Sequence, residues 1–231
     1  MATPALPLDV LYEDNHLLVV NKPALLPTMG VASSRPSLLA VAKQYLREKY
    51  DKPGKVYLGV VSRLDAPVTG VVVVARTSKA AGRLSEQFRK HAVEKAYWAA
   101  VEGVPDSSHD TLEDFLLKDD RHRRVHVTHA KSPDAQLARL QYSVRNSLID
   151  FSLLEVLLET GRKHQIRVQL SKAGHPILGD RKYGSQSDFS PGIALHARTL
   201  TLQHPVRTEQ MRFEAPLPAS WQKSRVVAKL L

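Results

Sequence analysis

Short runs of apolar residues, separated by polar breaks, recur along the 231-residue chain and predict a structure built mainly of strands. The first two runs, at 10–12 and 17–20, are separated by four polar residues and predict a hairpin. A long run at 93–101 alternates, which places Val93, Lys95, Tyr97, Ala99 and Val101 on one face of a strand. The other predicted strands span 56–61, 71–75, 112–117, 124–129, 135–144, 148–159, 193–203 and 210–214.

Three segments instead carry apolar residues at helical spacing. Ser37 is the predicted N-cap of a helix that ends near Tyr50, and Thr77 or Ser78 caps a second helix that ends near His91. A third helix is predicted over 162–173, before the stop at Gly174. Because strands dominate, we predict an α+β fold with a largely antiparallel mixed sheet and a few flanking helices. No linker divides the chain, so we predict a single domain over residues 1–231.

The connection between the runs at 56–61 and 71–75 carries the most informative polar residues, Arg63 and Asp65. Loops held by rigid strands are where catalytic residues concentrate. A neighbouring cation favours the ionised form of a carboxylate, and an ionised carboxylate can act as a nucleophile or a base. A structural ion pair or an Asp-containing turn explains the same residues equally well. Both interpretations stay open on these residues alone.

A second polar segment, Thr160 to Arg167, lies where a strand gives way to the start of the third helix. Backbone amides at a helix start attract anions, and the added cations strengthen that attraction. The segment is therefore a candidate phosphate-binding site. The alternative is an ordinary solvated basic helix start. Arg167 lies one turn into the helix, where it could point toward a buried carboxylate instead of toward solvent.

The charge balance favours a polyanionic partner, because 33 Lys and Arg outnumber 23 Asp and Glu and give a formal net charge of +10. The chain has no cysteine, which excludes disulfides, thiolate catalysis and zinc sites built on cysteine. Residues 1–8 lack the features of a secretory signal, and no apolar run is long enough to span a membrane. We expect a soluble cytoplasmic protein and a monomer.

Three histidines, His122, His126 and His129, invite a metal hypothesis. On a strand the first two share a face and the third points away. No acidic or thiol partner is expected beside them, so we predict no metal site.

Taken together, these segments resemble the RluA-type family of RNA pseudouridine synthases. The family's catalytic signature is approximately His-Arg-Leu-Asp-x-x-Thr-Ser-Gly, and residues 62–70 match it around Asp65. A second signature, Gly-Arg-x-His-Gln-Ile-Arg-x-x-Leu, is matched by residues 161–170. Further matches lie, in the family's order, at 11–14, 21–23, 95–97, 174–176, 179–184, 194–197 and 213–216. The resemblance covers nearly the whole chain, and its catalytic part begins near Asp9, so we expect no separate N-terminal RNA-binding domain.

The chain departs from the family pattern at two places in the catalytic signature. Ser62 stands where the family usually has histidine, and Val68-Thr69 stand where it has Thr-Ser. Ser62 removes an imidazole beside the loop, while Thr69 keeps a hydroxyl before the glycine. We interpret both as tuning of the loop or of the substrate.

The resemblance implies isomerisation of uridine to pseudouridine in structured rRNA or tRNA, with no cofactor and no metal. Asp65 is then the catalytic carboxylate, Arg167 the cation that keeps it charged, and Tyr97 the residue that stacks on the target uracil and helps remove its C5 proton. Arg63 is expected to fill the space left by the flipped nucleotide, or to clamp that nucleotide. The resemblance does not decide whether Asp65 attacks C1′ or C6, or only deprotonates the sugar. The other expected substrate-binding residues are Thr69, Lys95, Arg162, His164, Gln165 and Ile166.

Two other functions fit parts of the sequence. A nucleoside or glycoside hydrolase also acts at C1′, but it normally pairs two carboxylates, and the Asp65 segment has no acidic companion. A non-catalytic RNA-binding or ribosome-assembly factor on the same fold is the other alternative, and Ser62 is the residue that favours it.

Overall fold

The computed structural model describes residues 7–30, 36–51 and 53–231, which fold into two compact units. Unit 1 comprises Met1–Val93 and Arg198–Pro216, and unit 2 comprises Glu94–Ala197 and Leu217–Leu231. Each unit is described by itself below. Most of the stretch 1–8, for which no secretory signal is predicted, lies outside the described residues. One catalytic domain over the whole chain, without a separate N-terminal module, stays a prediction.

Unit 1 is built around β4, a strand in which every residue is buried. Strand β2 pairs with β4 in antiparallel register from Leu17↔Ala75 to Lys22↔Gly70, and β1 pairs with β2 as the predicted hairpin. Strand β10 begins in unit 2 and pairs in unit 1 with β11, also antiparallel. The elements are β1 (Val10–Glu13), β2 (Leu17–Lys22), α1 (Leu38–Lys49), β3 (Gly59–Val60), β4 (Thr69–Ala75), α2 (Ser78–Arg89), β10 (Leu195–Gln203) and β11 (Gln210–Glu214).

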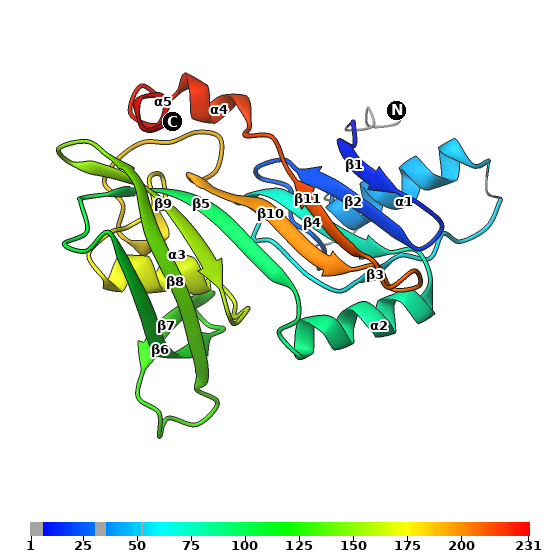
Figure 1. Ribbon diagram of the computed structural model, residues 1–231, viewed down its shortest axis with the longest axis horizontal. Helices are drawn as coiled ribbons and strands as arrows, with labels where there is room; N and C mark the ends of the chain where they lie inside the picture. Colours follow the sequence, from blue (N-terminus) through cyan, green and yellow to red (C-terminus); the bar gives the residue numbers. More distant parts are fainter. Residues whose placement is uncertain (1–6, 31–35, 52) are drawn as a thin grey trace. The chain divides into compact units, whose positions relative to one another are not determined.

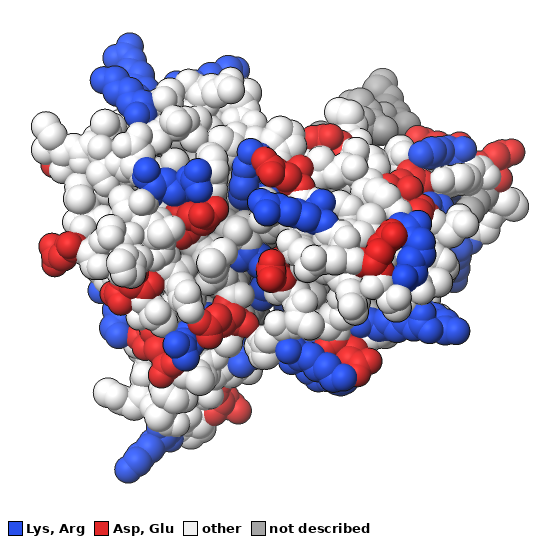
Figure 2. Space-filling model, viewed as in Figure 1, with Lys and Arg blue, Asp and Glu red and all other residues white. Residues whose placement is uncertain are grey.

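The two helices of unit 1 begin where the sequence predicts, because each has a hydroxyl cap. Ser37 Oγ accepts the Ala40 N–H at 3.3 Å, and Thr77 Oγ1 accepts the Ala80 N–H at 3.1 Å. Helix α2 buries Ala80 and Leu84 in a core that also contains Leu17, Val73 and Phe213. Its basic residues stay outside, and Figure 2 shows them gathered over this helix.

Unit 2 is a sheet of five antiparallel neighbours, in the order β5, β9, β8, β6, β7. Helix α3 packs against β6, β7 and a short 3-10 turn, η1 (Figure 1). The elements are β5 (Glu94–Glu102), β6 (His109–Asp119), β7 (Arg124–Thr128), β8 (Gln136–Ser147), β9 (Phe151–Leu158), α3 (Gln165–Lys172), η1 (Arg181–Tyr183), α4 (Ala219–Lys223) and α5 (Val227–Leu230). The predicted α+β class with a largely antiparallel sheet is confirmed.

Several predicted boundaries differ from the structure, and two short helices were not predicted. The run at 56–61 forms only the two-residue strand β3, although Val56 and Leu58 are buried. The helix predicted from residue 162 begins at Gln165, because His164 adopts a left-handed backbone with φ 55° that a helix cannot continue through. The short helices α4 and α5 were not predicted, since five and four residues are too few to show helical periodicity.

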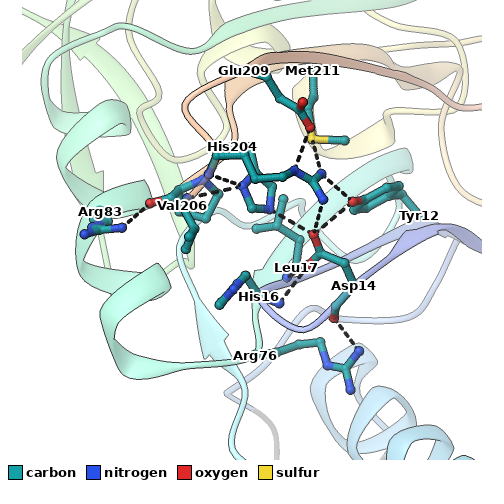
Figure 3. A network of polar contacts seen from close by, with 12 residues as sticks. Tyr12, Asp14, His16, Leu17, Arg76, Arg83, His204, Val206, Glu209 and Met211 are labelled. Atoms are coloured by element: carbon teal, nitrogen blue, oxygen red, sulfur yellow. Dashed lines mark hydrogen bonds and ion pairs between the residues drawn. The ribbon is translucent and has the colours of Figure 1, made fainter.

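A buried polar network fastens the β1–β2 turn to the β10–β11 turn in unit 1 (Figure 3). His204, fully buried, accepts the backbone N–H groups of Val206 and Arg207 at Nδ1, at 3.2 and 2.9 Å. Two donors at Nδ1 leave the ring proton on Nε2, which donates to Asp14 Oδ2 at 2.9 Å. Burial alone would raise the pKa of Asp14, but the hydrogen bonds that its carboxylate accepts from the His16 and Leu17 backbone, Tyr12 and His204 lower it to about 2.

Acidic and basic side chains are interspersed over much of the face drawn in Figure 2. In the part of the chain that the structure describes, no helix is both long and apolar enough to cross a membrane.

Candidate active site

The segment that carries Asp65 is an ordered connection from β3 to β4. The Asp65 carbonyl accepts the Val68 N–H at 3.1 Å and closes a turn over Ala66 and Pro67. Leu64 and Val68, on either side of the turn, are buried, while Asp65 is half-buried. Two buried neighbours therefore anchor the backbone on both sides of a half-buried carboxylate.

A second loop of unit 1, residues 23–30, holds this connection from the side. Thr28 Oγ1 donates to the Leu64 carbonyl at 2.9 Å and accepts the Leu64 N–H at 3.1 Å. Thr28 is 3% exposed, so both bonds are shielded from water. The reciprocal pair fixes the backbone one residue before Asp65.

Lys22 completes the attachment from the end of β2. Its side chain is fully buried, and Nζ donates to the carbonyls of Pro23 and Leu26 at 2.8 Å and of Ala66 at 3.2 Å. Burial lowers the pKa of Lys22 to about 7, while the negative charge of Asp65 opposes this shift. An ammonium has three N–H donors, and three carbonyl acceptors match them. One buried cation thus joins β2 and the 23–30 loop to the turn that follows Asp65.

In unit 2, β5 presents Lys95 and Tyr97 on one face, as the alternation predicts. Both residues are half-buried, and Tyr97 is paired across the sheet with Val156. Burial lowers the pKa of the Lys95 amine. Its Nζ lies 3.8 Å from the position that a Cβ would take on Gly161, so this face of β5 approaches the second polar segment.

The second polar segment is organised by the side chain of Gln165, the first residue of α3. Its Oε1 accepts from Thr160 Oγ1 at 2.8 Å and from the Arg162 N–H at 3.0 Å, and Nε2 donates to the Arg139 carbonyl at 3.1 Å. Gln165 is 2% exposed. A buried amide therefore ties this segment to β8, in place of the side-chain cap that α3 lacks.

Arg167 forms a bidentate ion pair with Asp180, which precedes η1. Its Nε donates to Asp180 Oδ2 at 2.7 Å and its Nη2 to Oδ1 at 2.9 Å. The two residues are 6% and 2% exposed, and the guanidinium carbon lies 5.0 Å from the centre of the Tyr183 ring. Tyr183 Oη in turn lies 2.7 Å from His164 Nδ1 and accepts the Val125 N–H at 3.0 Å. Arg167 is thus oriented by a carboxylate and an aromatic ring of its own unit.

The predicted substrate-binding residues differ in exposure, with Lys95 and His164 half-buried. Arg63 is exposed, and Arg162, also exposed, donates from Nε to the Leu137 carbonyl at 2.9 Å. Thr69, Gln165 and Ile166 are buried, at 3%, 2% and 4% exposure. The structure therefore gives Gln165 a part in holding its own segment, and its predicted contact with substrate stays a prediction.

Sequence reasoning missed three residues that organise these segments: Lys22, Thr28 and Asp180. Lys22 is spaced by two residues from Val20 and by four from Leu18, so the three side chains lie on the same buried face of β2. This spacing was the sequence signal for the burial of Lys22. Asp180 lies within the matched segment 179–184, but nothing in that match indicates its partner. For Thr28 we find no local signal.

The histidine prediction needs one correction. Asp119 is an acidic partner of both His122 and His126, with its Oδ2 at 2.7 Å from His122 Nδ1 and at 3.4 Å from His126 Nε2. His122 lies in the turn before β7, and His129 lies beyond its end, so the three do not share one strand. Among the residues that the structure describes, no group of three or more His, Cys, Asp or Glu could hold a metal ion.

Known proteins match the chain along most of its length. The sequence model of the RNA pseudouridylate synthase family matches residues 16–172. The uncharacterized RNA pseudouridine synthase YhcT of Bacillus subtilis is 36% identical over 215 residues, which are 92% of this chain and 69% of that protein. The ribosomal large subunit pseudouridine synthase D of Zymomonas mobilis is 34% identical over 239 residues, with 94% of this chain and 71% of that protein covered.

A solved structure agrees with these matches. The human RNA pseudouridylate synthase domain containing 4 superposes with a TM-score of 0.76 at 29% identity, and the match covers 91% of this chain and 88% of that one. The family match contains both the Asp65 connection and the segment from Thr160 to Arg167. This chain belongs to the RNA pseudouridylate synthase family, whose members are isomerases that act on uridine in RNA.

Proposed function

We propose that this protein converts a uridine of structured ribosomal RNA to pseudouridine, with Asp65 as the catalytic carboxylate. The observation that carries the proposal is the built environment of Asp65, whose flanking backbone is fixed by Thr28 and Lys22. Such fixing places a charged group before substrate arrives, which is what electrostatic and covalent catalysis need. The ribosomal assignment follows relatives that are named ribosomal large subunit pseudouridine synthase D.

The reaction moves one base without changing the atoms of the nucleotide. The N1–C1′ bond breaks, the uracil turns, and a C5–C1′ bond forms; C5 then loses its proton and N1 gains one. Asp65 acts as the ionised carboxylate at the sugar or the base. Tyr97 stacks on the uracil and helps remove the C5 proton. Its place on the same face of β5 as Lys95, where both residues are half-buried, supports that role.

Arg167 is the cation that we assign to keep the catalytic carboxylate ionised. A guanidinium has five N–H donors in a rigid plane, and the Asp180 pair fixes that plane. Mutation of Arg167 should therefore lower the rate of the reaction.

RNA phosphates are the proposed partners of the basic surface of unit 2. Burial lowers the pKa of Lys182, and the positive charges of Arg167, Arg124 and Lys163 lower it further, so these cations are concentrated around one point. Lys182, Lys163 and the Arg121–Arg124 turn suit a polyanion, whereas Arg167 is buried against Asp180. RNA affinity should fall steeply as salt rises from low to physiological levels, and an affinity insensitive to salt would contradict this assignment.

The experiment is to incubate the protein with an in vitro transcript of large-subunit rRNA that is tritiated at uridine C5, then digest the RNA and identify the nucleosides. Tritium release with pseudouridine in the digest supports the proposal. Free uracil indicates the N-glycoside hydrolase, and binding without release indicates the non-catalytic assembly factor. A tRNA transcript in parallel separates the two RNA classes. Fractionated cells would test the proposed cytoplasmic location, and the sedimentation coefficient would test the proposed monomer.

A further inference from the structure

Leu25 lies on the 23–30 loop of unit 1 in a conformation that a leucine rarely adopts. Its φ is +64°, in the left-handed region, where a Cβ crowds the following carbonyl. Its side chain is also 66% exposed, the largest exposure among the big apolar side chains that the structure describes in unit 1. The strained backbone of Leu25 is unfavourable for folding, and its exposed side chain adds no stabilising burial. Such strain is typical of residues that serve a function rather than stability.

The turn that presents Leu25 is tied to the turn that follows Asp65. Lys22 Nζ donates to the Pro23 and Leu26 carbonyls, which bracket Leu25, and to the Ala66 carbonyl. Thr28 binds both backbone groups of Leu64. Leu25 and Asp65 thus sit on two loops that one buried ammonium and one buried hydroxyl hold together.

A second large apolar side chain of the same loop is exposed, since Met29 is 41% exposed. A loop that approaches RNA only to contact phosphate would carry cations or amides instead. Exposed leucine and methionine side chains are instead typical of residues that pack on, or wedge between, bases. A target uridine that leaves its stack exposes the faces of its neighbours to water. An apolar side chain held beside the catalytic carboxylate could cover one of these faces.

We propose that Leu25 packs on a nucleobase flanking the target uridine and so favours the unstacked state of the substrate. This inference rests on the proposed function of Asp65. Leu25 contacts RNA and leaves the chemistry to other residues.

The test compares two glycine substitutions in unit 1. Glycine adopts positive φ without a penalty, so both Leu25→Gly and Thr208→Gly (φ +60° in the β10–β11 turn) should raise the midpoint of thermal unfolding. Only Leu25→Gly removes the proposed base contact. Tritium release from the C5-tritiated large-subunit rRNA transcript should fall about tenfold for Leu25→Gly and stay within about twofold of wild type for Thr208→Gly.

A short unstructured oligonucleotide with the same label provides the second readout. There the loss for Leu25→Gly should shrink to about twofold, because little stacking must be disrupted. Equal turnover by Leu25→Gly and wild type on the rRNA transcript would overturn this inference alone. An equal loss on both substrates would overturn the role in unstacking. Absence of release by the wild type would overturn the proposed function, and this inference with it.

Discussion

The Asp65 connection in unit 1 and the start of α3 in unit 2 are held by different kinds of bond. Around Asp65, side chains bind backbone: Lys22 and Thr28 bond to carbonyl and amide groups of the loop. Around Arg167, side chain binds side chain, through two charge-assisted bonds to Asp180. The first arrangement fixes the path of the backbone on both sides of Asp65. The second fixes the orientation of one functional group. The two regions should therefore fail differently when they are mutated.

Asp180→Asn should have the largest effect on stability, because it leaves the buried Arg167 guanidinium without its counter-charge. Breaking a buried pair from one side typically costs about 3–5 kcal/mol. Urea unfolding measures this loss. The double variant Asp180→Asn/Arg167→Met removes both charges and should recover a large part of it. If the single variant unfolds at the same urea concentration as wild type, the pair does not hold α3.

Lys22→Met should come next, at about 2–4 kcal/mol, since three carbonyls of a buried turn lose their donor while the volume is roughly kept. In contrast to Asp180→Asn, this variant should loosen the Asp65 loop. The rate of amide hydrogen exchange should therefore rise more at Leu64 and Val68 than in the rest of unit 1. Lys79→Met, at an exposed lysine of α2 in the same unit, is the matched control and should change little. An equal increase in amide hydrogen exchange across all of unit 1 would contradict a local role for Lys22.

Asp14→Asn tests a third kind of attachment, in which one carboxylate joins two turns (Figure 3). The folded pKa of Asp14, about 2, lies below its unfolded value of about 3.9, so its contribution is present above pH 4 and is lost as pH falls toward 2. The variant should lose about 2 kcal/mol at pH 7. That difference should shrink steadily between pH 5 and pH 2. A difference that stays constant over this range would show that the charge of Asp14 is not what holds the turns.

Arg63→Ala should have the smallest effect, none on stability and about tenfold, or roughly 1.4 kcal/mol, on turnover of structured RNA. Arg63 is exposed beside Asp65, so its predicted role concerns the flipped nucleotide and not the fold. Tritium release should fall much less on an unstructured oligonucleotide. Equal losses on both substrates would count against that role.

The sequence predicted what depends on neighbours along the chain. Ser37 and Thr77 cap their helices, and the alternation around Tyr97 gives its face of β5, because caps and side-chain direction are local properties. The Asp65 connection was found in the same way, between two apolar runs. These features needed no knowledge of tertiary contacts.

The rest depended on contacts that local patterns do not encode. Alternation places Lys22 on the face of Leu18 and Val20, but it does not show that carbonyls from residues 4 and 44 positions away converge on the Lys22 amine. Gln165 begins α3 three residues later than predicted, since its side chain satisfies the preceding backbone. Asp180 binds Arg167, which lies 13 residues earlier in the sequence. In each case a polar group found its partner only after the chain had folded.

The most direct test of the account is tritium release by Asp65→Asn, with Asp150→Asn, at an exposed carboxylate of unit 2, as the matched control. Both variants should bind the large-subunit rRNA transcript and unfold at nearly the wild-type temperature. Asp65→Asn should lose release by about a thousandfold or more, because an amide can neither attack nor take a proton, and Asp150→Asn should match the wild type. Release by Asp65→Asn at the wild-type rate would show that Asp65 is not the catalytic carboxylate.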